Sequence, residues 1–182
     1  IKDVLAYLKT IANGNDDIAI LRIINVPKRG IGATTIAKVS EYANENNISL
    51  YDAMSISEMA GVGKASDKIK SFITMIEEFR EKVAKKANIA NLIEELLEET
   101  GYIESLYDEG EIEGESRKEN IDELINKSRE YEDGELSLFL EDVSLVADID
   151  RMDENVDRIT LMTLHGAKGL EFDTVYLAGM EE

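Results

Sequence analysis

The fold is decided around residues 21–38, LRIINVPKRGIGATTIAK, where two helical patterns meet at a glycine-bearing turn. The first pattern ends at Asn25-Val26-Pro27, because proline cannot continue a helix and also restricts the residue before it. Gly30-Ile31-Gly32 then lets the backbone turn sharply. We therefore expect a second helix over roughly 33–45, in a helix–turn–helix arrangement.

This turn carries the pattern of a phosphate contact. A helix that starts just after it presents free backbone N–H groups, where the positive end of the helix dipole can hold a phosphate. Lys28 and Arg29 add two cations, and Thr34 and Thr35 add hydroxyl donors, as in helix–hairpin–helix modules that hold a DNA backbone without reading bases. An ordinary helix–helix turn is the alternative. The candidate residues are Lys28, Arg29, Gly30, Ile31, Gly32 and Thr34.

Helical periodicity continues on both sides of this segment. Apolar residues at 69, 72, 73, 76, 79 and 83 follow the i, i+3, i+4, i+7 spacing of the longest predicted helix, over 66–87. Ser49 with Asp52 and Ser116 with Glu119 fit capping boxes, which place helix starts there. Polar segments 107–119 and 131–134 are predicted as surface loops. The other predicted helices cover 2–12, 18–24, a short stretch after Ser49, 90–100, 116–131 and 136–148.

A second glycine turn, Gly61-Val62-Gly63-Lys64, precedes the longest helix. It is not a nucleotide P-loop, because Glu58 stands where that motif needs glycine and Ala65 stands where it needs a hydroxyl. A second phosphate contact and a purely structural turn both remain open for it.

Charge is distributed very unevenly along the 182 residues. The chain has 20 Lys+Arg and 39 Asp+Glu, a net charge of −19. Residues 1–90 hold 13 basic and 11 acidic side chains, whereas residues 91–182 hold 7 and 28, and residues 21–40 contain no acid. Salt screening confines each field to about 8–10 Å, so the overall acidity does not exclude a DNA-facing edge.

Several classes of site and location are excluded or disfavoured. The absence of cysteine excludes disulfides and cysteine-built zinc sites, and one histidine excludes sites with two imidazoles. The acidic stretch 148–153 departs from a calcium loop, with Met152 at a ligand position and Asp153 where glycine is needed, so no metal site is predicted. With no apolar run that approaches a membrane span and no signal peptide, we expect a cytoplasmic protein without a membrane partner.

The last 24 residues, ITLMTLHGAKGLEFDTVYLAGMEE, have a different sequence pattern from the helical part. They indicate a strand, a turn into a short helical piece, and another strand, which need a sheet outside this sequence. His165, the single histidine, lies where the first strand ends, a position that often carries function in α/β sheets. We expect the chain to be an excised part of a larger protein.

These residues carry a resemblance to a known family. TLMTLHGAKGLEF followed by VYLAGMEE resembles motif V of superfamily 1 DNA helicases of the UvrD/PcrA/Rep type, and RIINVPKRGIGATTI resembles the duplex-contacting turn of their 2B subdomain. The opening IKDVLAYLK also resembles the start of that subdomain. The implied fold is mainly α: a multi-helix 2B-type subdomain at 1–155, then 156–182 as a short β segment returning to the RecA-like α/β domain 2A.

The resemblance also implies roles for individual residues. In the C-terminal segment, Thr163 and His165 would contact single-stranded DNA, Gly169 and Glu171 would contribute to ATP binding, and Lys168 would shape the turn coupling the two sites. The candidate residues between Lys28 and Thr34 would hold the duplex ahead of the junction.

The implied function is that of the DNA-engaging part of an ATP-dependent 3′-to-5′ helicase in repair or replication. ATP and Mg²⁺ would belong to the full-length protein, because the P-loop, the acidic Mg²⁺ motif and the arginine finger are not in this chain. We therefore expect no bound cofactor and no complete catalytic site here. Expected partners are a single strand–duplex DNA junction, the RecA-like domains and a regulatory or loading protein. The alternative is a protein-interaction or autoregulatory domain whose acidic half binds a basic partner.

Overall fold

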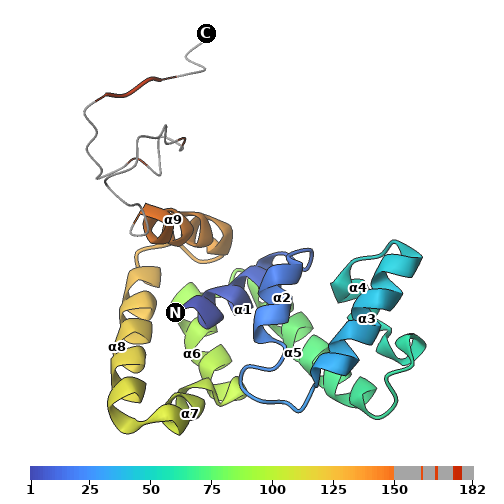
Figure 1. Cartoon of the computed structure of the whole chain (residues 1–182). Helices are drawn as coiled ribbons and strands as arrows, with labels where there is room; N and C mark the ends of the chain where they lie inside the picture. Colours follow the sequence, from blue (N-terminus) through green and yellow to red (C-terminus); the bar gives the residue numbers. More distant parts are fainter. Residues whose placement is uncertain (150–160, 162–166, 168–173, 178–182) are drawn as a thin grey trace. The chain divides into compact units, whose positions relative to one another are not determined.

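The computed structural model describes residues 1–149, 161, 167 and 174–177. Within these residues the secondary structure is helical, as Figure 1 shows, and no strand is present, which confirms the mainly α prediction. Two 3-10 segments, η1 (Ser57–Ala60) and η2 (Tyr107–Glu109), interrupt the α-helices. The α-helices are α1 (Lys2–Ala12), α2 (Asp17–Ile23), α3 (Ala33–Asn46), α4 (Leu50–Ser55), α5 (Ala65–Ala84), α6 (Ile89–Thr100), α7 (Tyr102–Leu106), α8 (Glu111–Ser128) and α9 (Leu136–Ile149).

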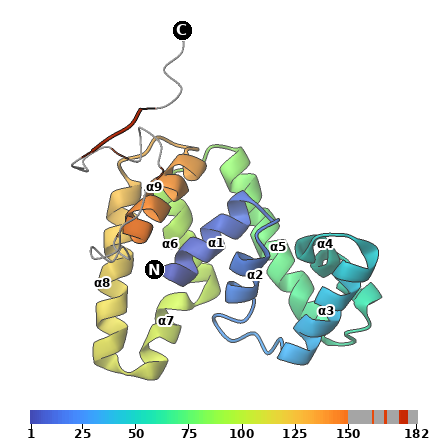
Figure 2. The same ribbon diagram turned by 45° about the horizontal axis from the view of Figure 1, so that its top comes forward.

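The chain divides into two compact units, Ile1–Leu140 and Glu141–Glu182. The first unit is organised around the long helix α5, which contacts α1, α4 and α6 (Figures 1 and 2). The apolar stripe of α5 is buried as its spacing predicts, with Ile69, Phe72, Ile76 and Phe79 at most 2% exposed. Burial of this stripe is the main apolar contribution that holds the neighbouring helices to α5.

Several predicted helix ends have the expected capping geometry. The Ser49 hydroxyl accepts a hydrogen bond from the Asp52 backbone N–H at 3.0 Å, so the first predicted capping interaction is confirmed. The Asp16 carboxylate does the same for the Ala19 N–H at 2.9 Å at the start of α2. Gly101 ends α6 in the left-handed conformation, with φ +63°.

The prediction for residues 107–119 is wrong. This stretch is not a loop: it contains η2 and the first half of α8, and Ser116 lies inside that helix instead of capping it. Gly110, with φ +134°, is the N-cap of α8. Gly114 lies inside the helix and packs against the Tyr107 ring. A Cβ at Gly114 would lie only 2.6 Å from Cδ1 of Tyr107. Gly114 is therefore explained by close packing against Tyr107 and not by a turn.

The predicted C-terminal strands fall mostly outside the described residues. Of the first, only Leu161 is described, and of the second only residues 174–177; none of these is in a strand. The expected domain boundary near residue 155 also lies outside the described part and stays a prediction.

The described residues contain neither a membrane-spanning helix nor a cluster of metal-ligating side chains. No helix among them combines the length and apolar character needed to cross a membrane. In the same residues, no cluster of three or more His, Asp or Glu side chains is arranged to hold a metal ion.

Candidate nucleic-acid interface

The loop between α2 and α3 is held from within by Arg29. Its Nη1 donates to the carbonyl oxygens of Ile23, the last residue of α2, at 3.0 Å and of Val26, in the loop, at 3.2 Å. Its Nη2 donates to the Tyr7 hydroxyl, and the guanidinium also lies over the Phe72 ring, 5.3 Å from the centroid. Arg29 is thus engaged by the body of the protein.

Tyr7 completes this arrangement beneath the loop. Its ring is buried, and its hydroxyl donates to the Val26 carbonyl at 2.6 Å. Burial raises the pKa of the Tyr7 phenol above its usual value, an effect opposed by the neighbouring Arg29. The phenol therefore stays protonated at neutral pH and keeps its donor role.

Two further side chains fix the course of the turn. The Asn25 side-chain oxygen accepts from the backbone N–H of Arg29 at 2.8 Å and from that of Ile31 at 3.3 Å. The Ile31 side chain is 1% exposed and anchors the turn in the core. Gly30, with φ +68°, adopts a conformation that L side chains rarely take, so this position requires glycine. The turn is therefore preorganised without help from a ligand.

The first turn of α3 is left open at its N-terminus. Gly32 is the N-cap, with φ −75° and ψ 161°, and no side chain caps the helix. Ser49, the N-cap of α4, has nearly the same backbone, φ −65° and ψ 157°, but caps its helix with a hydroxyl. No acceptor in the described part of the chain bonds the N–H of Ala33 or Thr34. Ala33 and Thr34 are both exposed, so an anion can reach this helix N-terminus.

The second glycine turn lies next to the first. Both of its glycines have positive φ, +66° at Gly61 and +58° at Gly63, and α5 follows without a side-chain cap. A lysine from each of the two helices contacts the glycine turn that precedes the other helix. Lys68 of α5 donates to the Gly30 carbonyl at 3.3 Å, and Lys38 of α3 donates to the Gly61 carbonyl at 3.5 Å. The N-termini of α3 and α5 therefore form one edge of the molecule (Figure 1).

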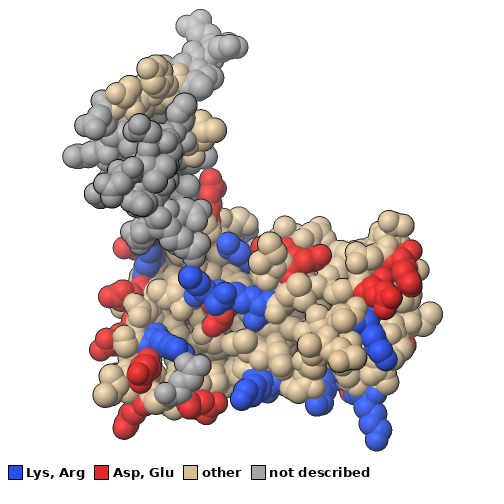
Figure 3. Space-filling view, viewed as in Figure 1, with Lys and Arg blue, Asp and Glu red and all other residues tan. Residues whose placement is uncertain are grey.

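This edge is basic. Figure 3 shows Lys and Arg side chains gathered along the lower margin, below the α2–α3 loop and the first turns of α3 and α5, and acidic side chains over α8. Lys28 and Lys64 are exposed, and neither forms an ion pair within the described residues. Both cations are therefore available to a polyanion.

The structure separates the predicted site residues into three groups. Lys28, Gly30, Gly32 and Thr34 are exposed together on the loop and the first turn of α3. Arg29 and Ile31 turn inward and support the loop. The C-terminal candidates lie outside the described residues: Thr163, His165, Lys168, Gly169 and Glu171.

Three residues of this edge were not predicted from the sequence. Asn25 could have been found, because asparagine side chains often bond backbone groups a few residues further on in turns. Lys38 and Lys68 contact carbonyls 23 and 38 residues away, and no local pattern indicates such pairs.

Comparison with known proteins gives a consistent result over the whole chain. Residues 1–182 match the family described as the UvrD-like helicase C-terminal domain. The ATP-dependent DNA helicase PcrA of Bacillus subtilis is 45% identical over 193 residues, covering 100% of this chain and 26% of that protein. The PcrA helicases of Staphylococcus epidermidis and Staphylococcus aureus are each 46% identical, with the same coverage. The chain spans about a quarter of the length of these curated relatives.

Proposed function

The chain belongs to the UvrD-like helicase C-terminal domain family, and from this premise we propose that it is the DNA-engaging part of an ATP-dependent 3′-to-5′ DNA helicase. The site proposed here is the edge formed by the α2–α3 loop and the first turns of α3 and α5. Its substrate is duplex DNA next to a single strand–duplex junction, held through the phosphates without base reading.

One observation carries this proposal: the open N-terminus of α3. Its backbone matches that of the Ser49 N-cap, whose hydroxyl covers the start of α4 and bonds its third N–H group, yet glycine places no side chain over the N–H groups of Ala33 and Thr34. A phosphate at this point would be bonded by two N–H groups, favoured by the helix dipole and approached by the Lys28 side chain. The start of α5 differs, because the N–H groups of Ala65 and Ser66 already bond carbonyl oxygens of the preceding turn, so the support for a second phosphate contact on this edge comes from the exposed Lys64 side chain.

We assign the chemistry of ATP to the rest of the helicase. This sequence contains no P-loop motif, so the 182-residue chain is proposed neither to hydrolyse ATP nor to unwind DNA. By family resemblance, residues 1–155 form the 2B-type subdomain and residues 156–182 return to domain 2A. There Thr163 and His165 are proposed to contact the single strand, Gly169 and Glu171 the nucleotide, and Lys168 the turn between them.

Substitution of Gly32 tests the phosphate site without harming the fold. No atom lies within 4 Å of a Cβ at this position, and its φ is negative, so Gly32→Asp and Gly32→Asn both fit. Each side chain caps α3 and leaves the chain at least as stable as the parent. Gly32→Asp should weaken binding to a fluorescein-labelled junction about tenfold in an anisotropy titration, because its carboxylate repels phosphate.

The asparagine variant separates charge from occupation of the N–H groups. It should weaken DNA binding less than Gly32→Asp, since it fills the cap without adding a negative charge. An unchanged affinity for the aspartate variant, with an unchanged or higher melting temperature, would show that the α3 N-terminus does not bind DNA.

A further inference from the structure

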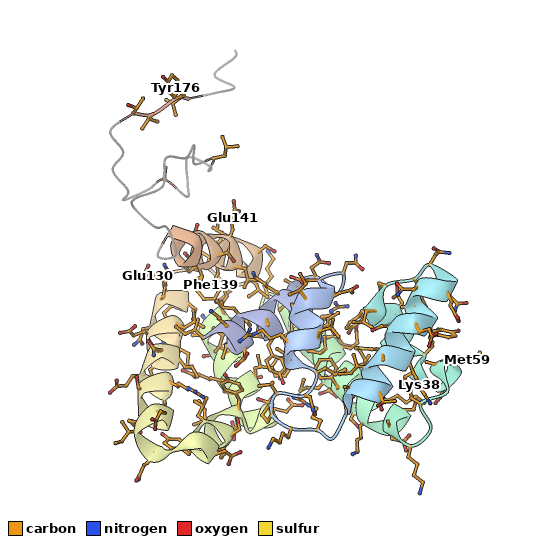
Figure 4. The ribbon with its side chains drawn as sticks, viewed as in Figure 1. Lys38, Met59, Glu130, Phe139, Glu141 and Tyr176 are labelled. Carbon is orange, nitrogen blue, oxygen red and sulfur yellow. The ribbon has the colours of Figure 1, made fainter. Side chains whose placement is uncertain are left out.

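A groove lies beside the DNA-facing edge, between α3 and η1. It has a volume of about 470 Å³ and is lined by residues of these two elements and by Gly61. Figure 4 labels one residue on each side, Lys38 on α3 and Met59 on η1, at the same end of the molecule. All the residues that line the groove belong to residues 1–90, the near-neutral half of the sequence. The charge of the groove is therefore set by its own side chains and not by the acidic residues 91–182.

The η1 side of the groove exposes a large apolar side chain. Met59 lines the groove and is 68% exposed. Tyr42 of α3 lines the groove opposite Met59 and is half-buried. Met59 and the Tyr42 ring therefore give the groove an apolar part, and methionine adapts its shape to different partners.

The α3 side of the groove is acidic. Glu41 and Glu45 are one helical turn apart, both line the groove, and both are exposed. Neither forms an ion pair within the described residues, whereas Glu58 of η1 is already paired with Lys70. Two unpaired carboxylates beside an apolar surface are complementary to a chain segment with cationic and apolar side chains.

We propose that this groove docks a peptide segment of a partner protein in which an apolar side chain is next to Lys or Arg. The apolar side chain contacts Met59 and Tyr42, and the cations contact Glu41 and Glu45. Lys38 lies at the Gly61 end of α3, so the cations of the peptide lie toward Glu45, away from Lys38. This docking does not depend on the proposed DNA function.

Charge argues against the two other occupants. DNA would bring phosphates against Glu41 and Glu45. A second copy of this chain carries a net charge of −19, so the approach of two copies is opposed by repulsion. Because Gly61 and Lys38 belong both to the groove and to the DNA-facing edge, a docked partner would lie beside the duplex.

The test uses the 182-residue chain and a defined probe, the fluorescein-labelled peptide Gly-Ser-Leu-Lys-Arg-Leu-Ser-Gly. Two matched peptides replace Lys-Arg by Glu-Glu or both leucines by serine. The parent peptide should bind, and the double substitution Glu41→Lys with Glu45→Lys should weaken it about tenfold. Met59→Ser should also weaken it, and both matched peptides should bind more weakly than the parent.

A matched control excludes general attraction to an acidic protein. Glu119 and Glu123 of α8 are exposed and have the same four-residue spacing, so Glu119→Lys with Glu123→Lys changes the net charge equally. This variant should bind the peptide like the unmodified chain, and circular dichroism should show the same helicity for all variants. An equal loss in both double variants would overturn the proposal. Met59-dependent self-association in sedimentation, or DNA binding that rises in the Glu41/Glu45 variant while peptide binding stays unchanged, would also overturn it.

Discussion

Two adjacent cations in the α2–α3 loop have opposite surroundings. Lys28 is exposed and unpaired within the described residues, whereas Arg29 holds the carbonyls that end α2 and the Tyr7 hydroxyl. Arg29→Met should lower the free energy of unfolding by about 2–3 kcal/mol, because it removes the hydrogen bonds that a charged group donates to the loop carbonyls and to the Tyr7 hydroxyl. Urea denaturation measures this decrease, and an unchanged stability would show that the inward-facing guanidinium contributes little.

Lys28→Met should have the complementary effect. The free energy of unfolding of this variant should stay within about 0.5 kcal/mol of that of the parent, because the Lys28 side chain is exposed and has no ion-pair partner among the described residues. The slope of log K for DNA against log salt should fall in magnitude by about 0.9, the value expected when one phosphate is no longer neutralised by a cation. Titrations at several salt concentrations measure this slope. An unchanged slope would place Lys28 outside the DNA-binding surface.

At the scale of elements, the start of α8 shows how glycine can have a packing role inside a helix. Gly114→Ala in an exposed helix would add about 1 kcal/mol of stability. Here the added Cβ would lie 2.6 Å from the Tyr107 ring, so we expect a loss of about 1–3 kcal/mol. Thermal unfolding measures this change, and a gain in stability would show that the ring moves aside freely.

Ser116→Ala is the matched test for the same helix. If Ser116 capped a helix, this change would cost about 1 kcal/mol. Because Ser116 lies within α8, alanine should leave the stability unchanged or raise it slightly. If chemical denaturation showed that the free energy of unfolding falls by about 1 kcal/mol, Ser116 would be the N-cap and the helix would start there.

Local sequence signals predicted the elements whose determinants are themselves local. The cap at Ser49, the stripe of α5 and the glycine turn before α3 all depend on residues a few positions apart. η2 and the first half of α8 were predicted as a loop because Gly110 and Gly114 are typical of loops, whereas the packing of Gly114 against Tyr107 depends on the folded structure. The inward role of Arg29 and the lysine bonds between the two turns depend on tertiary structure in the same way.

At the scale of the whole molecule, the excess negative charge belongs to the second half of the chain, whereas the first half is near-neutral. Acidic side chains gather over α8, and cations gather along the edge formed by the first turns of α3 and α5 (Figure 3). Fields beyond about 8–10 Å are screened at physiological salt, so the acidic surface does not prevent phosphate binding at that edge. Its expected effect is to keep DNA from binding elsewhere on the protein.

Neutralisation of α8 tests this effect directly. We expect the combined substitution of Glu111, Glu113, Glu119 and Glu123 by Gln, all exposed, to increase affinity for plain duplex DNA more than for a junction. The preference for the junction, measured as the ratio of the two affinities by competition anisotropy, should therefore fall. Adding Gly32→Asp to this variant should reduce junction binding but leave the increased duplex binding intact, since the two sites are separate. If the preference were unchanged after neutralisation, the acidic surface would have no part in directing DNA to the basic edge.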